Sequence, residues 1–504
     1  MNRKYMIAII AILLIICAGA FAVTHLSNAG SASTSIDANA LEDRGNLVVD
    51  GKTLDESKGL YHTDSADTNA ILVKNGGVLK LVDSLLNKTG DTQTSGDDAD
   101  FYGVNSAILV NTNGTLDISN VEIITNSKGS NGIFVTNAEA SSSGSSQGSG
   151  DGGQPPEATG NGGAGQGSGD GAQPPEAQGS GEGGQVPGGN GGGPDETTVE
   201  GNTQANINNV KITTHSDKSR GLDATYNGII NAVNVIINTD GQSCAALATD
   251  RGEGQVHVKN SEINTGVSKD SGRGSPLIYS TGNITCENTK GTAYVSQIAC
   301  IEGKNSIELK DCDLTGYAEG NRKDGNAYVD LGGIFIYQSM SGDADVGTSH
   351  FTAKNTKLTI AEDSSVYKEA PMFHVTNTAC VIDLENTELS FGSGLFLEIA
   401  GQNQWGNQGS NGGTAELNTN NEKIEGNVIV DSISSLTWIM KNTEFKGAIN
   451  STGNTTVNVA EGSTWTLTGD SSVSALEVSG NIDYGSYTLT VNGQKYTSSN
   501  PYKG

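Results

Sequence analysis

Large side chains are scarce in this chain of 504 residues, because aromatic residues make up only 5% of it. A single large globular core is normally filled by bulky apolar side chains, and this composition supplies few of them. Glycine is abundant instead, with 69 residues. The composition therefore argues against one large core and favours a thin core of Val, Ile, Leu and Ala.

Cysteine is also scarce, and its spacing argues against a metal site. Of the six cysteines, the five that follow residue 22 contain no Cys-x-x-Cys pair: Cys244, Cys286, Cys300, Cys312 and Cys380. Zinc and similar metals usually need ligands that lie close together in the sequence. The odd number favours buried, unpaired thiols over a complete set of disulfides. We therefore expect no metal at the cysteines.

Positive charge is the third shortage, since 29 Lys and Arg stand against 57 Asp and Glu and give a net charge of −28. Such a surface repels phosphate backbones, so we expect no nucleic-acid partner. It also argues against adsorption to anionic lipid or anionic polysaccharide without a bridging cation. We expect contact with a membrane only through the N-terminal segment.

Residues 1–22 have the pattern of an export signal. Asn2-Arg-Lys4 supplies positive charge, an apolar run follows from Met6 to Val23, and Ala20-Phe-Ala22 fits a cleavage site. We therefore expect a secreted or cell-surface protein. If cleavage does not occur, the apolar run is just long enough to anchor the chain in a membrane. A lipid anchor at Cys17 is a weaker alternative, because lipoproteins carry a small residue where this chain has Ile16.

A short apolar motif recurs along the chain with its hydrophobic positions aligned. Its clearest copies are Ala70-Ile-Leu-Val73, Ala107-Ile-Leu-Val110, Gly132-Ile-Phe-Val135, Gly221-Leu-Asp-Ala-Thr225, Ala245-Ala-Leu-Ala-Thr249, Gly333-Ile-Phe-Ile-Tyr337 and Phe373-His-Val-Thr376. Several copies are spaced by about 24 residues, the length of one coil in a repeat protein. A unit of this size cannot bury its apolar face alone, so successive units must stack on one another.

Two further apolar runs follow most copies, such as Thr115-Leu-Asp-Ile118 and then Val121-Glu-Ile-Ile124. Three short strands per coil of about 24 residues predict an all-β fold, a parallel β-helix with one long insert. The turns are rich in asparagine, which tolerates left-handed backbone angles and can form stacked amide ladders. These turn residues are Asn75, Asn113, Asn120, Asn209, Asn234, Asn260 and Asn386. A β-sandwich is the alternative, and the regular spacing argues against it.

The insert is a low-complexity segment at residues 138–202, made mostly of Gly, Ser, Gln, Pro and Glu. It contains a duplication, because Gln147 to Ala158 recurs as Gln166 to Ala177. Since it has no apolar face, we predict a disordered loop that leaves one coil between its first and second strands. The predicted organisation is an export signal or anchor at 1–22, a linker and cap at 23–64, β-helix at 65–137, the insert at 138–202, β-helix at 203–495 and a tail at 496–504.

The chain resembles the adhesin-like right-handed parallel β-helix proteins of bacteria and archaea, which have the pectin-lyase-like architecture. The resemblance is carried by the export signal, by the Asn/Gly-rich coils, and by segments such as Ser219 to Gly228, Tyr337 to Asp345 and Trp405 to Gly413. It covers roughly residues 65–495 without the insert. It implies a cell-surface location and, with the bias of parallel crossovers, a right-handed helix.

The outward positions of the first strand in each coil form the candidate ligand-binding site. They are Phe134, Asp223, Glu302, Phe335, Tyr337, His374 and Glu398. Aromatic faces stack on sugar rings and carboxylates accept hydrogen bonds from hydroxyl groups, so this row predicts a stripe that binds a polysaccharide or cell-surface glycan. Two alternatives remain: loops cover the row, or the assignment of inward and outward positions is shifted by one residue.

Enzymes share this architecture, so a polysaccharide lyase or glycoside hydrolase is the alternative function. Polygalacturonase-like enzymes carry Asn-Thr-Asp, Asp-Asp and Gly-His-Gly motifs in that order. Here Asn238-Thr-Asp240 follows Asp97-Asp98, and no Gly-His-Gly occurs. Arg220 with Asp223, and Asp250 with Arg251, are better interpreted as salt bridges than as catalytic groups. We therefore expect a non-catalytic protein and assign no catalytic residue.

Calcium is the one cofactor left open. Asp97, Asp98 and Asp100 lie close together in the sequence, as do Asp343 and Asp345. Carboxylates are the ligands that Ca²⁺ prefers, but no complete calcium-binding loop or glycine-rich calcium repeat surrounds them. We expect no cofactor, with Ca²⁺ as the possible exception, and the oligomeric state stays open.

Overall fold

The computed structural model describes residues 36–94, 96–140, 201–320, 323–324, 327–328, 330–339 and 341–503. The predicted export signal at 1–22 lies outside the described residues. So does the predicted insert at 138–202, apart from its first three and last two residues. The predictions of secretion and of disorder are therefore not tested by the structure.

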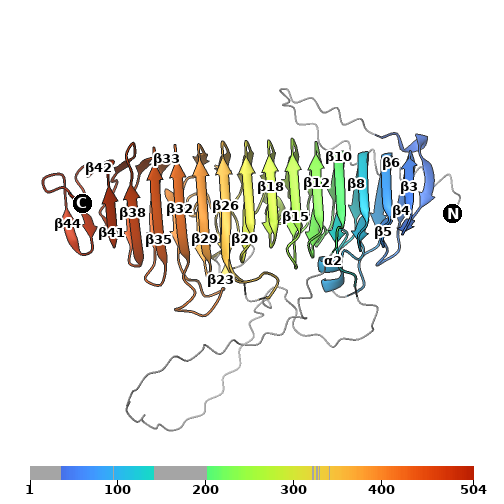
Figure 1. Cartoon of the computed structure of the whole chain (residues 1–504), viewed down its shortest axis with the longest axis horizontal. Coiled ribbons are helices and arrows are strands. Elements are labelled where there is room, and N and C mark those ends of the chain that lie inside the picture. The colour runs from blue at the N-terminus through green and yellow to red at the C-terminus, as the bar shows by residue number, and fades with distance from the viewer. Residues whose placement is uncertain are drawn as a thin grey trace, which may run out of the picture. The chain divides into compact units, whose positions relative to one another are not determined.

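The described residues form a parallel β-helix, which confirms the predicted fold class. Figure 1 shows the strands standing side by side in chain order, from the blue N-terminal coils to the red C-terminal coils. The first strand of each coil belongs to sheet B, whose described part has 16 strands. These are β2 (Leu47–Asp50), β5 (Ile71–Lys74), β7 (Ile108–Asn111), β9 (Ile133–Thr136), β11 (Leu222–Thr225), β14 (Leu247–Thr249), β17 (Ile278–Ser280), β20 (Ala299–Glu302), β25 (Ile334–Tyr337), β28 (Phe373–Thr376), β31 (Leu395–Ile399), β34 (Asn427–Val430), β37 (Ile449–Ser451), β40 (Ser471–Val473), β43 (Leu489–Val491) and β44 (Gln494–Tyr496).

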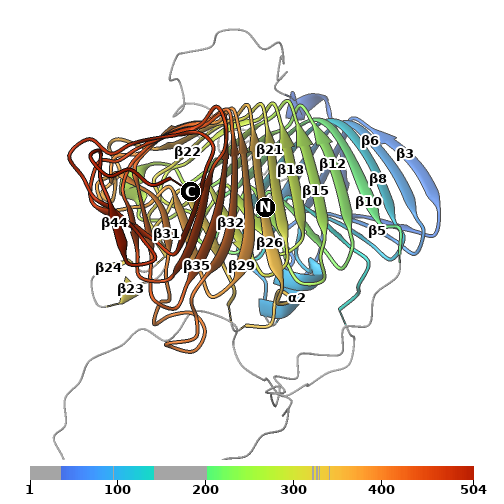
Figure 2. The ribbon, with the colours of Figure 1, turned by 60° about the vertical axis from the view of Figure 1, so that its left-hand side comes forward.

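Sheet A holds the second strand of each coil and many of the third strands, and Figure 2 shows its strands side by side across one broad face. The second strands are β3 (Thr53–Ser57), β12 (Ile229–Val233), β15 (Gln255–Lys259), β18 (Asn283–Glu287), β21 (Ser306–Lys310), β26 (Thr348–Lys354), β29 (Ala379–Glu385), β32 (Thr414–Asn420), β35 (Ser435–Lys441), β38 (Asn454–Val459) and β41 (Ala475–Val478). Three long strands span both positions: β6 (Val78–Thr89), β8 (Thr115–Asn126) and β10 (Gln204–Thr214).

The third strands of sheet A are β1 (Glu42–Gly45), β4 (Gly59–Thr63), β13 (Ile236–Thr239), β16 (Glu262–Thr265), β19 (Lys290–Ala293), β22 (Asp313–Gly316), β27 (Lys357–Ile360) and β30 (Glu388–Ser390). In the last coils a separate four-stranded sheet takes this position, with β33 (Lys423–Glu425), β36 (Glu444–Lys446), β39 (Thr464–Thr466) and β42 (Asn481–Asp483). Outside the coils lie the hairpin of β23 (Lys323–Asp324) and β24 (Ala327–Tyr328) and the helices η1 (Ala38–Ala40), α2 (Gly96–Tyr102) and η2 (Lys269–Ser271).

Coil length varies more than the predicted value of about 24 residues. Asn231 donates a hydrogen bond to Asn206, 25 residues earlier. Asn355 and Asp311 occupy equivalent positions 44 residues apart, whereas Asn458 and Glu477 are only 19 apart. The extra residues lie in the corner segments between strands, so they do not disturb the pairing of the strands themselves.

The core inside the coils is thin and mostly aliphatic, as the composition predicts. Side chains alternate along each strand, so Ile334 and Ile336 point into this core while Phe335 points away from it. The C-terminal half adds a ladder of inward aromatic rings, whose neighbouring centroids lie 4.6 to 5.9 Å apart. Its members are Phe351, Phe373, Phe396, Trp438, Phe445 and Trp465.

Asparagine residues form the predicted turns and ladders. All seven predicted turn residues have positive φ angles, from 53° at Asn75 to 64° at Asn113. Between the second and third strands, the side chain of Asn209 donates to Asn120 at 2.8 Å, and Asn386 donates to Asn355 at 2.9 Å. These amide bonds between coils help to offset the cost of the left-handed backbone.

The described strands begin before the predicted start of the β-helix at residue 65. Strands β1 to β4 pair with the coils that follow them, and the antiparallel strand β44 pairs with β43 at the other end. All five cysteines after residue 22 are buried and unpaired. No helix among the described residues is long and apolar enough to cross a membrane.

Candidate functional site

The predicted stripe lies on the outer face of sheet B. Phe134 pairs with Asp223 on the next strand, and the row continues later through Phe335, His374 and Glu398. Glu302 does not lie in this row, because it pairs with Tyr337 in a second row along the strands. The structure therefore brings the predicted residues onto one face, but in two adjacent rows.

The stripe is not exposed, and this corrects the prediction of an open ligand-binding surface. Six of the seven residues have less than a tenth of their surface accessible: Phe134, Asp223, Glu302, Phe335, Tyr337 and His374. Glu398 alone is half-buried. The assignment of inward and outward positions is correct, because loops and not the β-helix core bury this face.

Corner segments cover the middle of the outer face of sheet B, whereas Val48 and Asn450 towards its two ends are exposed. Three of these segments follow β6, β25 and β31. The first contains α2, and its Gly103 lies so close that an added Cβ would be 2.5 Å from the Phe134 ring. The second follows β25 and carries Ser339 and Asp343. The third follows β31 and places Trp405 against Tyr337, with ring centroids 4.7 Å apart.

A buried ionic cluster lies under α2, and we call it the Arg220 cluster. The guanidinium of Arg220 contacts three carboxylates: Asp250 at 2.7 Å, Asp100 at 3.0 Å and Asp223 at 3.4 Å. Lys218 completes the cluster through a 2.9 Å ion pair with Asp100. Asp223 is fully buried and Asp250 is 5% exposed, so water screens these charges poorly.

Burial controls the protonation of the Arg220 cluster. It raises the pKa of Asp250 to about 7, although Arg220 acts in the opposite direction. Burial and the nearby Asp250 raise the pKa of Asp223 well above its ordinary value. Burial alone would raise the pKa of Asp100 too, but Arg220 and Lys218 lower it below its ordinary value. The cluster therefore combines one firmly ionised carboxylate with two that hold protons more readily.

A second buried group, the Glu302 cluster, lies further along the same face. Glu302 accepts hydrogen bonds from Tyr279 at 2.7 Å, from Tyr337 at 3.0 Å and from the hydroxyl of Ser339. Phe335 stacks on Tyr337 with a centroid distance of 4.6 Å. Burial raises the pKa of Glu302, while the three hydroxyl donors act against that rise. This carboxylate is enclosed by aromatic rings and held by hydroxyl groups.

His374 also serves the packing of this face. One ring nitrogen lies 2.8 Å from the carbonyl oxygen of Leu331, and the other lies 2.7 Å from the amide nitrogen of Gln402. Phe335 meets the imidazole edge-on at 5.2 Å. Both ring nitrogens are therefore engaged by the segments around β25 and β31.

The carboxylates considered for calcium are engaged in ion pairs. Asp100 belongs to the Arg220 cluster, Asp343 lies 2.6 Å from Arg251, and Asp345 lies 2.7 Å from Lys304. Within the described part of the chain, no group of three or more His, Cys, Asp or Glu side chains is arranged to hold a metal ion. Asp97 and Asp98 lie in the first turn of α2.

Several residues of this face were not recognised in the sequence. Asp100 lies 120 residues before its partner Arg220, so no local pattern links them. Tyr279 lies on β17 in the same row as Phe335 but was not included in the predicted stripe, and Trp405 is an isolated aromatic residue in a polar segment. The available signal for a covered face was the length of some corner segments. Residues in excess of one coil length have to pack against the outside of the β-helix.

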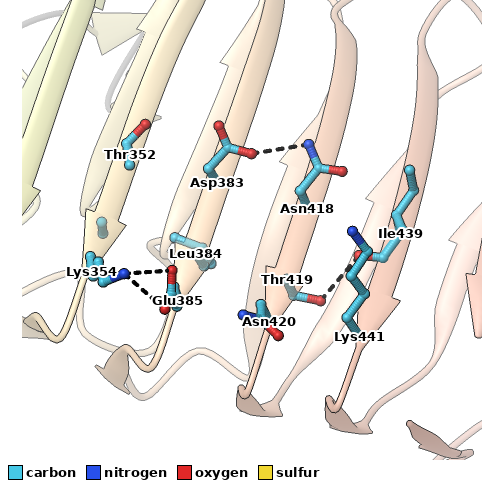
Figure 3. A pocket seen from close by; sticks show the side chains of 11 residues that line it. Thr352, Lys354, Asp383, Leu384, Glu385, Asn418, Thr419, Asn420, Ile439 and Lys441 are labelled. Carbon is cyan, nitrogen blue, oxygen red and sulfur yellow. Dashed lines mark hydrogen bonds and ion pairs between the residues drawn. The ribbon is translucent and has the colours of Figure 1, made fainter. Parts of the chain in front are cut away.

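Sheet A has the more open outer face, and two shallow hollows lie on it. One, of about 270 Å³, crosses β26, β29, β32 and β35. Figure 3 shows Asp383 and Asn418 pointing toward each other there from adjacent strands, with a 3.0 Å hydrogen bond from the amide to the carboxylate. Nearby, Lys354 lies 2.9 Å from Glu385. The second hollow crosses β6, β8, β10 and β12 and includes Asp117, Asn206 and Asn231.

Comparison with models of known protein families, and with curated proteins, gave no match for this chain.

Proposed function

We propose that this chain is a non-catalytic, secreted or cell-surface β-helix protein that binds a neutral polysaccharide through the open outer face of sheet A. The observation that carries the proposal is the contrast between the two outer faces. Loops close sheet B over its acidic and aromatic residues, whereas sheet A leaves its outward polar side chains accessible.

The open face offers hydrogen-bonding groups in regular rows. On sheet A, Asp117, Asn206 and Asn231 follow one another on paired strands, as do Asp383 and Asn418. These residues belong to one row, which continues between the two sets through His257, Thr285, Glu308 and Thr352 and reaches the apolar Ile439 after Asn418. Neighbouring strands are about 4.8 Å apart, so the row presents a polar side chain at each step before Ile439. Sugar hydroxyl groups donate and accept hydrogen bonds, and an extended chain could meet several of these side chains at once.

The charge pattern of the face favours a neutral ligand. Lys354 pairs with Glu385, and Lys259 and Lys310 both pair with Glu287. Because these lysines are balanced within the face, little positive charge is left to attract an anionic polymer. The net charge of −28 points the same way, since it repels polyanions over longer distances.

The extracellular location rests on the export pattern at residues 1–22 and on the resemblance to adhesin-like β-helix proteins. A long β-helix with one open face also suits a surface protein, because it can display the same type of contact along its length. These observations support an adhesin-like function.

A glycan array with the full chain tests the proposal, followed by titration of the best neutral glycan. We expect Asn418→Ala to weaken binding about threefold to tenfold, the size of one or two lost hydrogen bonds. Asn458→Ala is the matched control, because Asn458 also faces outward and donates at 2.9 Å to Glu477, but lies beyond the hollow. Absence of binding to every neutral glycan, or equal losses in both variants, would contradict the proposal.

A polysaccharide hydrolase or lyase is the second candidate, and one observation favours it. Asp250 has a pKa raised to about 7 and lies beside Asp223 and Arg220, as a general acid often lies beside other charged groups. The assay is release of reducing sugars or unsaturated products from a panel of polysaccharides. Activity that disappears in Asp250→Asn would replace the binding proposal with this one.

A further inference from the structure

The segment that contains α2 is held on sheet B by contacts that converge on a few residues. Asp100 forms its two ion pairs with Arg220 and Lys218, both of which belong to the next coils. The carbonyl oxygen of Phe101 accepts a hydrogen bond from Thr225 at 2.8 Å. These three polar contacts fix the inner side of α2 to the segment that leads into β11 and to β11 itself.

Aromatic contacts complete the attachment. The ring of Tyr102 stacks on Tyr226 with a centroid distance of 5.6 Å and an angle of 11° between the planes. The guanidinium carbon of Arg251 lies 3.9 Å from the centre of the Phe101 ring, which is a cation–π contact. Ala99 and Phe101 are also buried. The residues after the helix are held separately, because Asn69 donates to the carbonyl oxygens of Gly103 and Ser106, and Asn105 donates to those of Gly90 and Lys128. The charged contacts beneath α2 are therefore the part of its attachment that responds to pH.

The Arg220 cluster holds more carboxylates than cations. Asp100, Asp223 and Asp250 face Arg220 and Lys218, which leaves one negative charge in excess when all are ionised. An excess charge in a buried site raises the free energy of the folded state. Protonation of one carboxyl group removes this excess charge. The closed arrangement is therefore most favourable when the cluster has taken up a proton.

The groups around Asp250 come from every element packed against it, and most of them are acidic. Its charged and titratable neighbours are Arg220 and Asp223 near β11, Asp100 on α2, Asp343 on the segment after β25, and Glu302 on β20. Arg251 follows Asp250 in the chain but is paired with Asp343. The only cation in direct contact with Asp250 is Arg220, among the described residues.

We propose that α2, residues 96–102, is a pH-gated cover that closes over the Arg220 cluster in mildly acidic solution and detaches as the pH rises through neutral. This device concerns sheet B and is independent of the proposed function of sheet A. Failure of either proposal leaves the other standing.

The direction of the effect follows from proton linkage. Burial raises the pKa of Asp250 to about 7, and burial together with the nearby Asp250 raises the pKa of Asp223 well above its ordinary value. Detachment of α2 returns both carboxyl groups to water, where an aspartate has a pKa near 4. Detachment therefore releases protons, and each released proton makes detachment about tenfold more favourable per pH unit. In strong acid the cover loosens again, because Asp100 becomes protonated and loses its ion pairs.

Hydrogen exchange of the full chain, followed by mass spectrometry, tests the cover between pH 5 and pH 8. After correction for the intrinsic pH dependence of exchange, we expect protection of residues 96–102 to fall by more than tenfold per pH unit between pH 5 and pH 7, because both carboxyl groups release protons. Residues 379–385, in β29, are the internal control and should show no such slope. Constant protection of residues 96–102 in the wild-type chain would overturn the proposal.

The double variant Asp223→Asn, Asp250→Asn is the matched comparison, because the amides keep the shape but cannot release a proton. We expect its corrected protection to be independent of pH over this range. An unchanged slope in the double variant would also overturn the proposal. If circular dichroism shows that the double variant does not fold, the single variant Asp250→Asn is compared with the wild type instead. We then expect the corrected protection of α2 to fall less steeply with pH, below pH 7, in the single variant than in the wild type.

Discussion

The two outer faces of this β-helix are built from similar strands, yet one is closed and the other is open. On sheet B, Asp223 and Glu302 are buried under corner segments and held by Arg220 and by tyrosine hydroxyl groups. On sheet A, Asp383 and Asn418 are only half-buried, and Asn418 donates to Asp383 and to Glu416 at 3.0 Å each. The same residue types thus stabilise covering loops on one face and bond along and across the strands on the more open face.

The comparison shows that side-chain direction and exposure are separate properties in a β-helix. Direction is set within a coil by the alternation of the strand. Exposure is set by segments inserted at the corners, such as the one that carries α2. A carboxylate that points away from the core can therefore be as deeply buried as a core leucine.

The largest expected effect comes from breaking the ionic cluster on the closed face. Arg220→Met leaves Asp223 and Asp250 buried without a cation, and loss of one partner of a buried ion pair costs about 3 to 5 kcal/mol. The matched change on the open face is Lys354→Met, which breaks an exposed pair worth at most about 1 kcal/mol. Urea denaturation followed by circular dichroism measures both. Similar small losses would mean that the Arg220 cluster contributes little to stability.

Truncation of an aromatic ring on the closed face comes next. Phe335→Ala removes a ring that is 2% exposed and in contact with Tyr337 and His374, so we expect a loss of about 3 kcal/mol. Thr437→Ala on the exposed side of β35 is the control and should change stability by less than about 0.5 kcal/mol. A thermal melt of Phe335→Ala that matches the wild type would show that the loops do not pack on this ring.

The smallest of these effects concerns the asparagine ladder that borders sheet A. Asn386 has a φ of 55° and donates to Asn355, so Asn386→Ala places a strained residue there and removes the bond. We expect a loss of about 1 to 2 kcal/mol. Asn386→Gly separates the two causes, because glycine accepts the angle but cannot make the bond. If both variants lose the same stability, the amide bond and not the backbone angle carries the effect.

Much of the fold could be predicted from the sequence because strand pairing in a β-helix is periodic. The recurring motif identified the first strand of the coils, and the alternation of Ile334, Phe335 and Ile336 gave the correct inward and outward sides. The asparagine turns were predictable for a similar reason, since each ladder repeats one local conformation. The unequal coil lengths could not be predicted from the regular spacing. For that reason the prediction put Glu302 in the same row as Phe335, whereas in the structure Glu302 pairs with Tyr337.

The closed face could not be predicted, because its covering segments have no periodicity. Asp100 and Arg220 meet across 120 residues, and the insert lies between them in the sequence. The ion pair predicted between Arg220 and Asp223 is present. The predicted pair of Asp250 with Arg251 is wrong, because Asp250 contacts Arg220 and Arg251 contacts Asp343. The open face of sheet A was overlooked for a related reason, since its Asn and Asp residues resemble the polar side of any strand.

The most direct test of the account is a binding titration that compares one variant from each outer face against the same neutral glycan. Asn418→Ala alters the hollow on sheet A, while Glu398→Ala alters the half-buried member of the row on sheet B. We predict that Asn418→Ala weakens binding about threefold to tenfold and that Glu398→Ala leaves it unchanged. Loss of binding in Glu398→Ala with full binding in Asn418→Ala would contradict the account and return the ligand to sheet B.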